Sequence, residues 1–255
     1  MIITIAAQKG GVSKTTTAAA IAQALSFKKK KVLLVDVDAQ GSASLIYGAN
    51  EAGNGGSYSL ITGREKAKDL IQKTEAGEII PASNFIDQLD IELNNKPGRD
   101  SFLKNALDPI KEEYDFIIID TAPGLGTALV QALTAADKVI IPLLADPQAL
   151  QGLHQVHETI QQVQKYCNPS LEIACVCITQ YQARAILTRQ YEDLIADQCK
   201  DMKMHLAETR IRKGIAIQEA QALRKNLYEY APASNPALDY MALLQELKLI
   251  RSTKK

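Results

Sequence analysis

The hydrophobic residues of this chain gather in short apolar runs, which are separated by longer stretches with helical periodicity. The runs that read as strands span residues 2–7, 32–37, 116–119, 138–144 and 171–178, and the first helix is expected over residues 14–27. Runs such as Phe116-Ile117-Ile118-Ile119 are continuous and β-branched, which is typical of strands covered on both faces. Because strands that alternate with helices build βαβ units, the pattern predicts an α/β fold with a mostly parallel, twisted sheet and helices on both faces.

No internal repeat and no linker divides the chain. Its 255 residues suit one open α/β sheet, so we expect a single domain over residues 1–255. Residues 48–63 contain five glycines and predict a mobile surface loop.

Composition and charge restrict the partners. Lys+Arg and Asp+Glu are equal at 29 each, so binding to nucleic acid would need a local basic patch. The four cysteines show no metal-ligand spacing, and Cys175 and Cys177 alternate within an apolar strand as buried free thiols do, which fits a reducing compartment. No signal peptide is present, and no apolar stretch approaches the roughly 20 residues that span a bilayer. We therefore expect a cytoplasmic protein without a membrane partner.

The segment between the first strand and the first helix carries the chemistry. Glycines that turn a strand into a helix direct several backbone N–H groups to one point, and the helix N-terminus adds partial positive charge, so phosphate is the natural ligand. Lys14 is expected to contact the β- and γ-phosphates of a nucleotide, and Thr15 to ligate Mg²⁺. The predicted nucleotide-binding residues are Lys9, Gly10, Gly11, Val12, Ser13, Lys14, Thr15 and Thr16.

This loop departs from the general P-loop pattern GxxxxGK[ST]. Gln8 and Ser13 stand where the two glycines belong, whereas the form KGGxxKTT, with an additional lysine at Lys9, is met. The alternative is a basic, glycine-rich turn that binds no ligand. The order strand, loop, helix favours the phosphate-binding interpretation.

The loop resembles that of the ParA/MinD family, the deviant Walker ATPases, and most closely its ParA-type partition and cargo-positioning members. In that family the additional lysine, here Lys9, reaches across a nucleotide sandwich dimer to the partner's phosphates, which implies a homodimer that forms on ATP binding. The resemblance covers nearly the whole chain and is weakest over residues 51–80. Its further landmarks lie at residues 141–144, 151–153, 209–212, 219–220 and 230–234.

Two carboxylates follow predicted strands and complete the expected site. The segment around Asp38 resembles the family's DxDxQG motif, with Ala39 where proline is usual, and Asp38 is assigned to the attacking water and the Mg²⁺ shell. Asp36 is interpreted as structural. Asp120 ends an apolar strand as a Walker B aspartate does, although an aspartate there can also cap the next helix. The expected catalytic residues are thus Lys9, Lys14 and Asp38, and the expected metal-site residues are Thr15, Asp38 and Asp120.

The resemblance also implies a base-binding loop and a DNA-binding surface. The loop from Tyr230 to Pro236, including Pro232, is expected near the adenine. ParA-type dimers bind DNA without sequence preference, and the candidate contacts here are Arg184, Arg189, Arg212, Lys213, Arg224 and Lys225. The alternative for these residues is a solvated surface of mixed charge, because acidic residues are interspersed among them.

Together these features predict a weak, Mg²⁺-dependent ATPase on nucleoid DNA, stimulated by a ParB-like or cargo-adaptor protein. The cargo would be a plasmid, a chromosome or a protein assembly such as carboxysomes. Because the phosphate loop lies near residue 1, no N-terminal helix-turn-helix domain is expected.

Four alternatives compete with this interpretation. A MinD-like membrane cycler would need a C-terminal amphipathic anchor, but residues 243–251 are short, contain Glu246 and read better as a packed final helix. A metallocluster enzyme would need cysteines near the switch regions, and none precedes Cys167. A GTPase would show an N/TKxD motif, which is absent from the sequence. The fourth alternative is a binding scaffold that never hydrolyses ATP. It is considered because Ser13 and Ala39 alter the catalytic loops.

Overall fold

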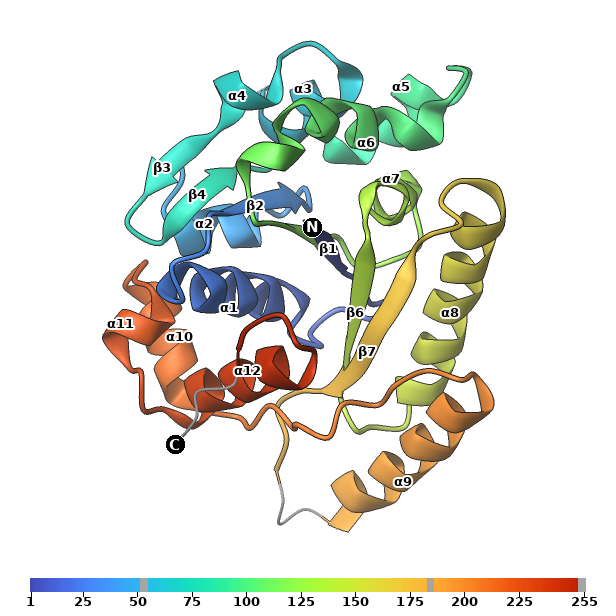
Figure 1. The fold of residues 1–255 in the computed structure, drawn as a ribbon. Helices are drawn as coiled ribbons and strands as arrows, with labels where there is room; N and C mark the ends of the chain where they lie inside the picture. The colour runs from blue at the N-terminus through green and yellow to red at the C-terminus, as the bar shows by residue number, and fades with distance from the viewer. Residues whose placement is uncertain (51–54, 183–185, 252–255) are drawn as a thin grey trace.

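The computed structural model describes residues 1–50, 55–182 and 186–251, and within these residues it forms one seven-stranded sheet in the order β3-β4-β2-β5-β1-β6-β7. The predicted strands are confirmed as β1 (Ile2–Ile5), β2 (Val32–Val37), β5 (Phe116–Thr121), β6 (Lys138–Leu143) and β7 (Glu172–Ile178), and all of them pair in parallel. The predicted α/β class with a mostly parallel sheet is therefore correct (Figure 1).

The edge of the sheet beside β2 was not predicted. There β3 (Gln72–Thr74) pairs antiparallel with β4 (Gly77–Ile80), and β4 pairs in parallel with β2. These strands are short and partly polar, so their periodicity is too brief to separate from that of a turn.

Helices cover both faces of the sheet (Figure 1). One face carries α1 (Lys14–Phe27), α2 (Ser42–Tyr47), α10 (Ile215–Ala222), α11 (Leu227–Tyr230) and α12 (Asn235–Glu246). The other carries α3 (Gly56–Thr62), α4 (Ala67–Leu70), α5 (Leu89–Leu93), α6 (Phe102–Leu107), α7 (Thr127–Ala135), α8 (Ala149–Tyr166) and α9 (Ile186–Asp201). Short 3-10 helices span Ile86–Gln88, Arg99–Ser101 and Asp108–Glu113.

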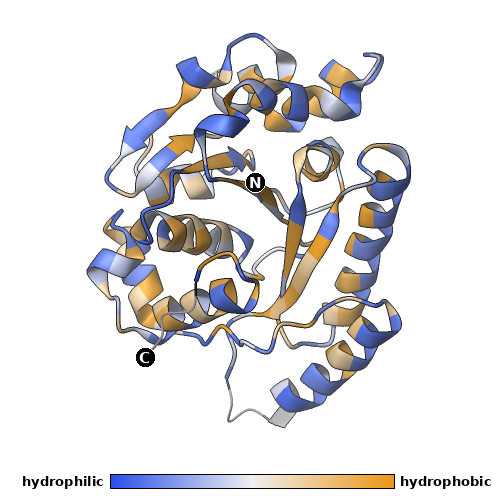
Figure 2. Cartoon of the chain, viewed as in Figure 1, coloured by the Kyte–Doolittle hydropathy of each residue, from blue (hydrophilic) through white to orange (hydrophobic). Residues whose placement is uncertain are grey.

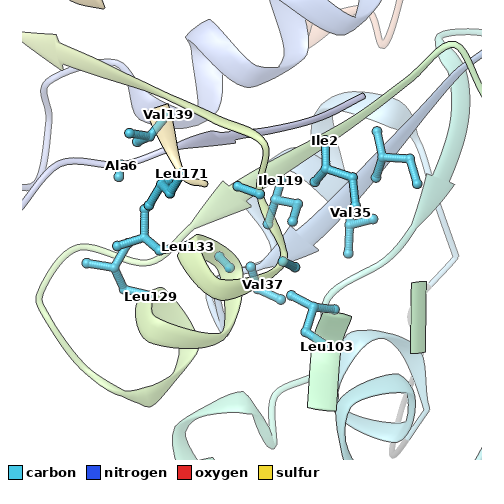
Figure 3. Close-up of a cluster of buried hydrophobic side chains, with 14 of the residues drawn as sticks. Ile2, Ala6, Val35, Val37, Leu103, Ile119, Leu129, Leu133, Val139 and Leu171 are labelled. Carbon is cyan, nitrogen blue, oxygen red and sulfur yellow. The ribbon is translucent and has the colours of Figure 1, made fainter. Parts of the chain in front are cut away.

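Alternate residues of each central strand enter two separate cores. On β2, Leu33, Val35 and Val37 belong to the core beneath α7 and α8, whereas Leu34 belongs to the core beneath α1 and α12. Figure 3 shows part of the first core, where side chains of several strands meet Leu129 and Leu133 of α7. Burial on both faces explains why the strand sequences are continuously apolar, and Figure 2 shows this as orange strands beneath helices with mixed surfaces.

In the glycine-rich stretch at 48–63, residues 51–54 lie outside the described residues, and residues 48–50 and 55–63 are more ordered than predicted. Gly48 and Gly63 are the left-handed C-caps of α2 and α3, with φ of 66° and 72°. Tyr58 and Leu60 of α3 are buried in the core. The prediction of a mobile loop was wrong here, because these glycines end helices.

The last helix packs onto the sheet as expected, but it begins and ends earlier than the predicted 243–251. Leu243 and Leu244 of α12 are buried, and the Tyr240 hydroxyl lies 2.9 Å from that of Thr17 on α1. Over the described residues, none of the helices combines the length and the apolar character that crossing a membrane requires.

Candidate nucleotide site

The site forms where the carboxyl ends of β1, β2 and β5 meet. The loop after β1 leads into α1, Asp38 follows β2, and Asp120 lies near the end of β5. In the sheet Asp120 is paired with both Asp36 of β2 and Ile5 of β1, so the register sets these chain segments side by side. Ligands of open α/β sheets bind at this edge.

The phosphate loop has an unusual backbone. Gly11 and Ser13 adopt positive φ angles of 77° and 66°, and α1 begins directly afterwards at Lys14. A left-handed conformation costs a residue with a side chain roughly 1 kcal/mol, which accounts for the glycine usually found at the position of Ser13. The backbone geometry is retained here even though the glycine is not.

Lys14 is buried in the centre of the site. Its side chain donates from Nζ to the carbonyl oxygen of Lys9 at 3.1 Å, and the residue is 6% exposed. Burial lowers the pKa of Lys14, while the neighbouring Asp120 and Asp38 favour its charged form. The structure thus brings together the lysine and the two carboxylates that the sequence predicts.

Asp120 has the environment of a cation ligand. It is completely buried, and among the residues that the structure describes neither carboxylate oxygen has a hydrogen-bond partner within 3.5 Å. Burial and then the charge of Asp36 raise the pKa of Asp120, whereas Thr15 and Lys14 favour ionisation. Because a bound cation would compensate an unpaired buried carboxylate, the residues fit a Mg²⁺ site.

Asp36 and Asp38 differ in their contacts. Asp36 accepts hydrogen bonds from Asp38 N at 3.2 Å, Ser44 N at 2.8 Å and Ser44 Oγ at 2.7 Å, and so holds the start of α2. Burial raises the pKa of Asp36 to about 6. Asp38 accepts from Gln40 N at 3.0 Å and is 7% exposed. These contacts agree with a structural role for Asp36 and leave Asp38 at the edge of the site.

Lys9 is held within its own chain. Its Nζ lies 2.6 Å from Oδ2 of Asp146, which precedes α8, and both side chains are partly exposed. Asp146 was missed by sequence reasoning, because it is 137 residues away and carries no local signal that links it to the loop.

A hollow with both polar and apolar lining residues adjoins the phosphate loop and α10. Its lining includes Ser13, Thr16, Gln180, Lys213, Gly214 and Pro236. A Cβ at Gly214 would lie 2.8 Å from Pro236, so only glycine allows this approach. Pro232, the predicted base contact, is exposed in the turn before α12 and lies outside this lining, whereas Pro236 is part of it.

The predicted DNA contacts are dispersed. Arg184 lies outside the described residues, and Arg189 is exposed on α9, whereas the other candidates follow α9 in the chain. Arg212 forms a bidentate ion pair with Asp239, with its closest contact at 2.6 Å. Lys213, Arg224 and Lys225 are exposed at the two ends of α10.

Comparison with known proteins identifies the family. A family model described as AAA domain (AAA_31) matches residues 1–173. The sporulation initiation inhibitor protein Soj of Bacillus subtilis is 36% identical over 249 residues, covering 96% of this chain and 97% of Soj. The chromosome partitioning protein ParA of Myxococcus xanthus is 34% identical over 257 residues, covering 100% of this chain and 89% of that protein. The chain belongs to the ParA/MinD family.

Solved structures agree with this family assignment. Cobyrinic acid a,c-diamide synthase from Mycobacterium smegmatis, with bound ADP and magnesium, superposes with a TM-score of 0.83 at 29% identity, over 97% of this chain and 95% of that one. In the present chain, the residues that match the family model include the phosphate loop, Asp38, Asp120 and Asp146. The elements beyond residue 173, including α10, are matched by the full-length relatives.

Proposed function

We propose that this chain is an Mg²⁺-dependent ATPase of the ParA type that dimerises around ATP, binds DNA without sequence preference and positions a cargo. The observation that carries the proposal is the desolvated Lys14 beside Asp38 and Asp120 at a strand–loop–helix junction. Phosphoryl transfer depends on positioning and on charge stabilisation, and this arrangement is suited to both.

The residues of the site have separate roles in the proposed reaction. Backbone N–H groups of residues 10–16 and the Lys14 ammonium bind the phosphates, and the hollow beside α10 takes the base. Thr15 and Asp120 hold the Mg²⁺, which neutralises charge on the phosphates. Asp38 orients the attacking water. The ADP and magnesium bound to the Mycobacterium relative support this assignment.

Lys9 is proposed to act in the partner subunit. In the single chain it is paired with Asp146, and partly exposed ion pairs contribute at most about 1 kcal/mol. Phosphates offer a stronger, multiply charged acceptor, so Lys9 exchanges Asp146 for the partner's nucleotide at little cost.

Lys9→Ala is expected to weaken dimerisation at least about 10-fold, the loss of one charge-assisted hydrogen bond, while leaving ATP affinity within about threefold. Dimer formation with a non-hydrolysable ATP analogue is measured by analytical ultracentrifugation. Lys68→Ala, which removes an exposed ion pair with Glu113, is the matched control and keeps the dimer. An unchanged dimer in Lys9→Ala would remove Lys9 from this role.

DNA binding is proposed for the surface at the ends of α10, where Lys213, Arg224 and Lys225 are exposed. Arg212 contributes less, because its guanidinium is engaged by Asp239. The name of the Myxococcus relative, which refers to chromosome partitioning, supports a role with chromosomal DNA. The proposal also includes a partner protein that stimulates hydrolysis. Localisation to the nucleoid follows from such binding.

The wild-type protein is expected to bind nonspecific duplex DNA with ATP and not with ADP, and its affinity should fall steeply with salt. Each phosphate contact contributes about −0.9 to the slope of log affinity against log salt, so Arg224→Ala with Lys225→Ala should reduce the slope by about 2 for each subunit that contacts the DNA. Fluorescence anisotropy across a salt series measures the affinity for DNA and its dependence on salt. Absence of binding in either state, with ATP hydrolysis intact, would favour the membrane-cycling alternative, which anionic lipid vesicles then test.

A further inference from the structure

The carbonyl side of the phosphate loop is held by two residues that follow β7. The Gln180 amide donates from Nε2 to the Gly11 carbonyl oxygen and to Ser13 Oγ, each at 3.0 Å. The Thr179 hydroxyl lies 3.1 Å from the carbonyl oxygens of both Val12 and Leu143. Three successive loop residues are therefore bonded from outside by one dipeptide.

The carbonyl oxygens of Val12 and Gly11 accept hydrogen bonds from Thr179 and Gln180, and the direction of these carbonyl groups matters. A loop that binds an anion through N–H groups must keep its carbonyl oxygens away from that anion, because they would repel it. Donors bonded to these carbonyl oxygens stabilise this orientation of the peptide planes before any ligand arrives. Thr179 also contacts Leu143 at the end of β6, so the loop is anchored to the sheet.

The backbone at both contact points is strained. Ser13 has a φ of 66° and Gln180 a φ of 50°, and neither is a glycine. Such left-handed conformations persist only where surrounding contacts enforce them. Here the two strained residues are joined to each other through the hydrogen bond between Nε2 and Oγ.

We propose that Thr179 and Gln180 form a clasp on the phosphate loop, and that Gln180 is a positioning residue that holds Ser13 in a glycine-like conformation. The clasp rests on the proposed binding of a nucleotide to this loop. The clasp affects nucleotide binding through the geometry of the phosphate loop. A glycine at position 13 adopts the same φ without help, so the need for Gln180 depends on the serine.

A double-mutant cycle tests the clasp. In the full chain Gln180→Ala is expected to weaken Mg-ATP binding about 10-fold, since two hydrogen bonds that orient the loop are lost. In the Ser13→Gly background the same substitution should cost about threefold or less, because only the bond to Gly11 is then removed. Isothermal titration calorimetry measures all four affinities. Gln182→Ala, an exposed glutamine two residues away, is the control and should bind as the wild type does.

Hydrogen exchange of the nucleotide-free protein gives a second measurement. Amides of residues 11–15 should exchange faster in Gln180→Ala, and Ser13→Gly should restore part of their protection, whereas the melting temperature stays close to that of the wild type. Equal effects of Gln180→Ala in both backgrounds, or no effect in either, would overturn the clasp while the proposed function stands. Failure of the folded wild-type protein to bind Mg-ATP would overturn the proposed function and, with it, the clasp's role.

Discussion

Lys14→Ala is expected to weaken ATP binding at least about 100-fold, to a level at which no dimer forms. The Lys14 ammonium is buried at the start of α1 and lies in the field of Asp38 and Asp120. Its removal takes away the buried positive charge that the chain's own phosphate loop directs at the β- and γ-phosphates. It also leaves the buried carboxylates without their cation, which makes approach of the phosphates still less favourable.

Titration with a fluorescent ATP analogue measures this loss, and circular dichroism confirms that the variant is folded. Lys28→Ala, at the exposed end of the same helix, is the matched control and should bind normally. Micromolar ATP affinity retained in Lys14→Ala would refute the phosphate-loop assignment, and with it the ATPase proposal.

Asp38→Ala is expected to slow hydrolysis by roughly 100-fold or more while ATP binding and dimerisation persist, because orienting or deprotonating a nucleophile contributes about that much. The Asp38 carboxylate accepts a hydrogen bond from Gln40 N of the turn that follows it, so truncation of this side chain disturbs little of the fold. Phosphate release over many hours, under saturating ATP, measures the intrinsic rate of both proteins.

Asp36→Asn serves as the comparison, since Asp36 holds Ser44 of α2 by two of its hydrogen bonds. That variant should lower the melting temperature, which Asp38→Ala should not. Turnover that is unchanged in Asp38→Ala would remove Asp38 from the reaction and would favour a different positioning group.

Local patterns predicted the centre of the molecule well. The bounds of α1 and β2 agree with the sequence prediction, because long apolar periodicity and a glycine loop leave few alternatives. The sequence alone predicts that Lys14, Asp38 and Asp120 lie close together, since the carboxyl ends of parallel strands share one edge of the sheet. The sequence does not predict the hairpin of β3 and β4 or the helix α3, because such short segments are stabilised mainly by packing on the sheet.

The sequence by itself determined the fold class, the phosphate loop and the carboxylates that face it, since each depends on neighbouring residues and on strand polarity. Only the tertiary structure decided which distant groups meet them. It placed Asp146 against Lys9, Pro236 in place of Pro232 beside the hollow, Asp239 on Arg212, and Gln180 on Ser13. Such contacts join residues far apart in the chain, and their geometry follows from how helices pack on the sheet, which no local pattern of residues encodes.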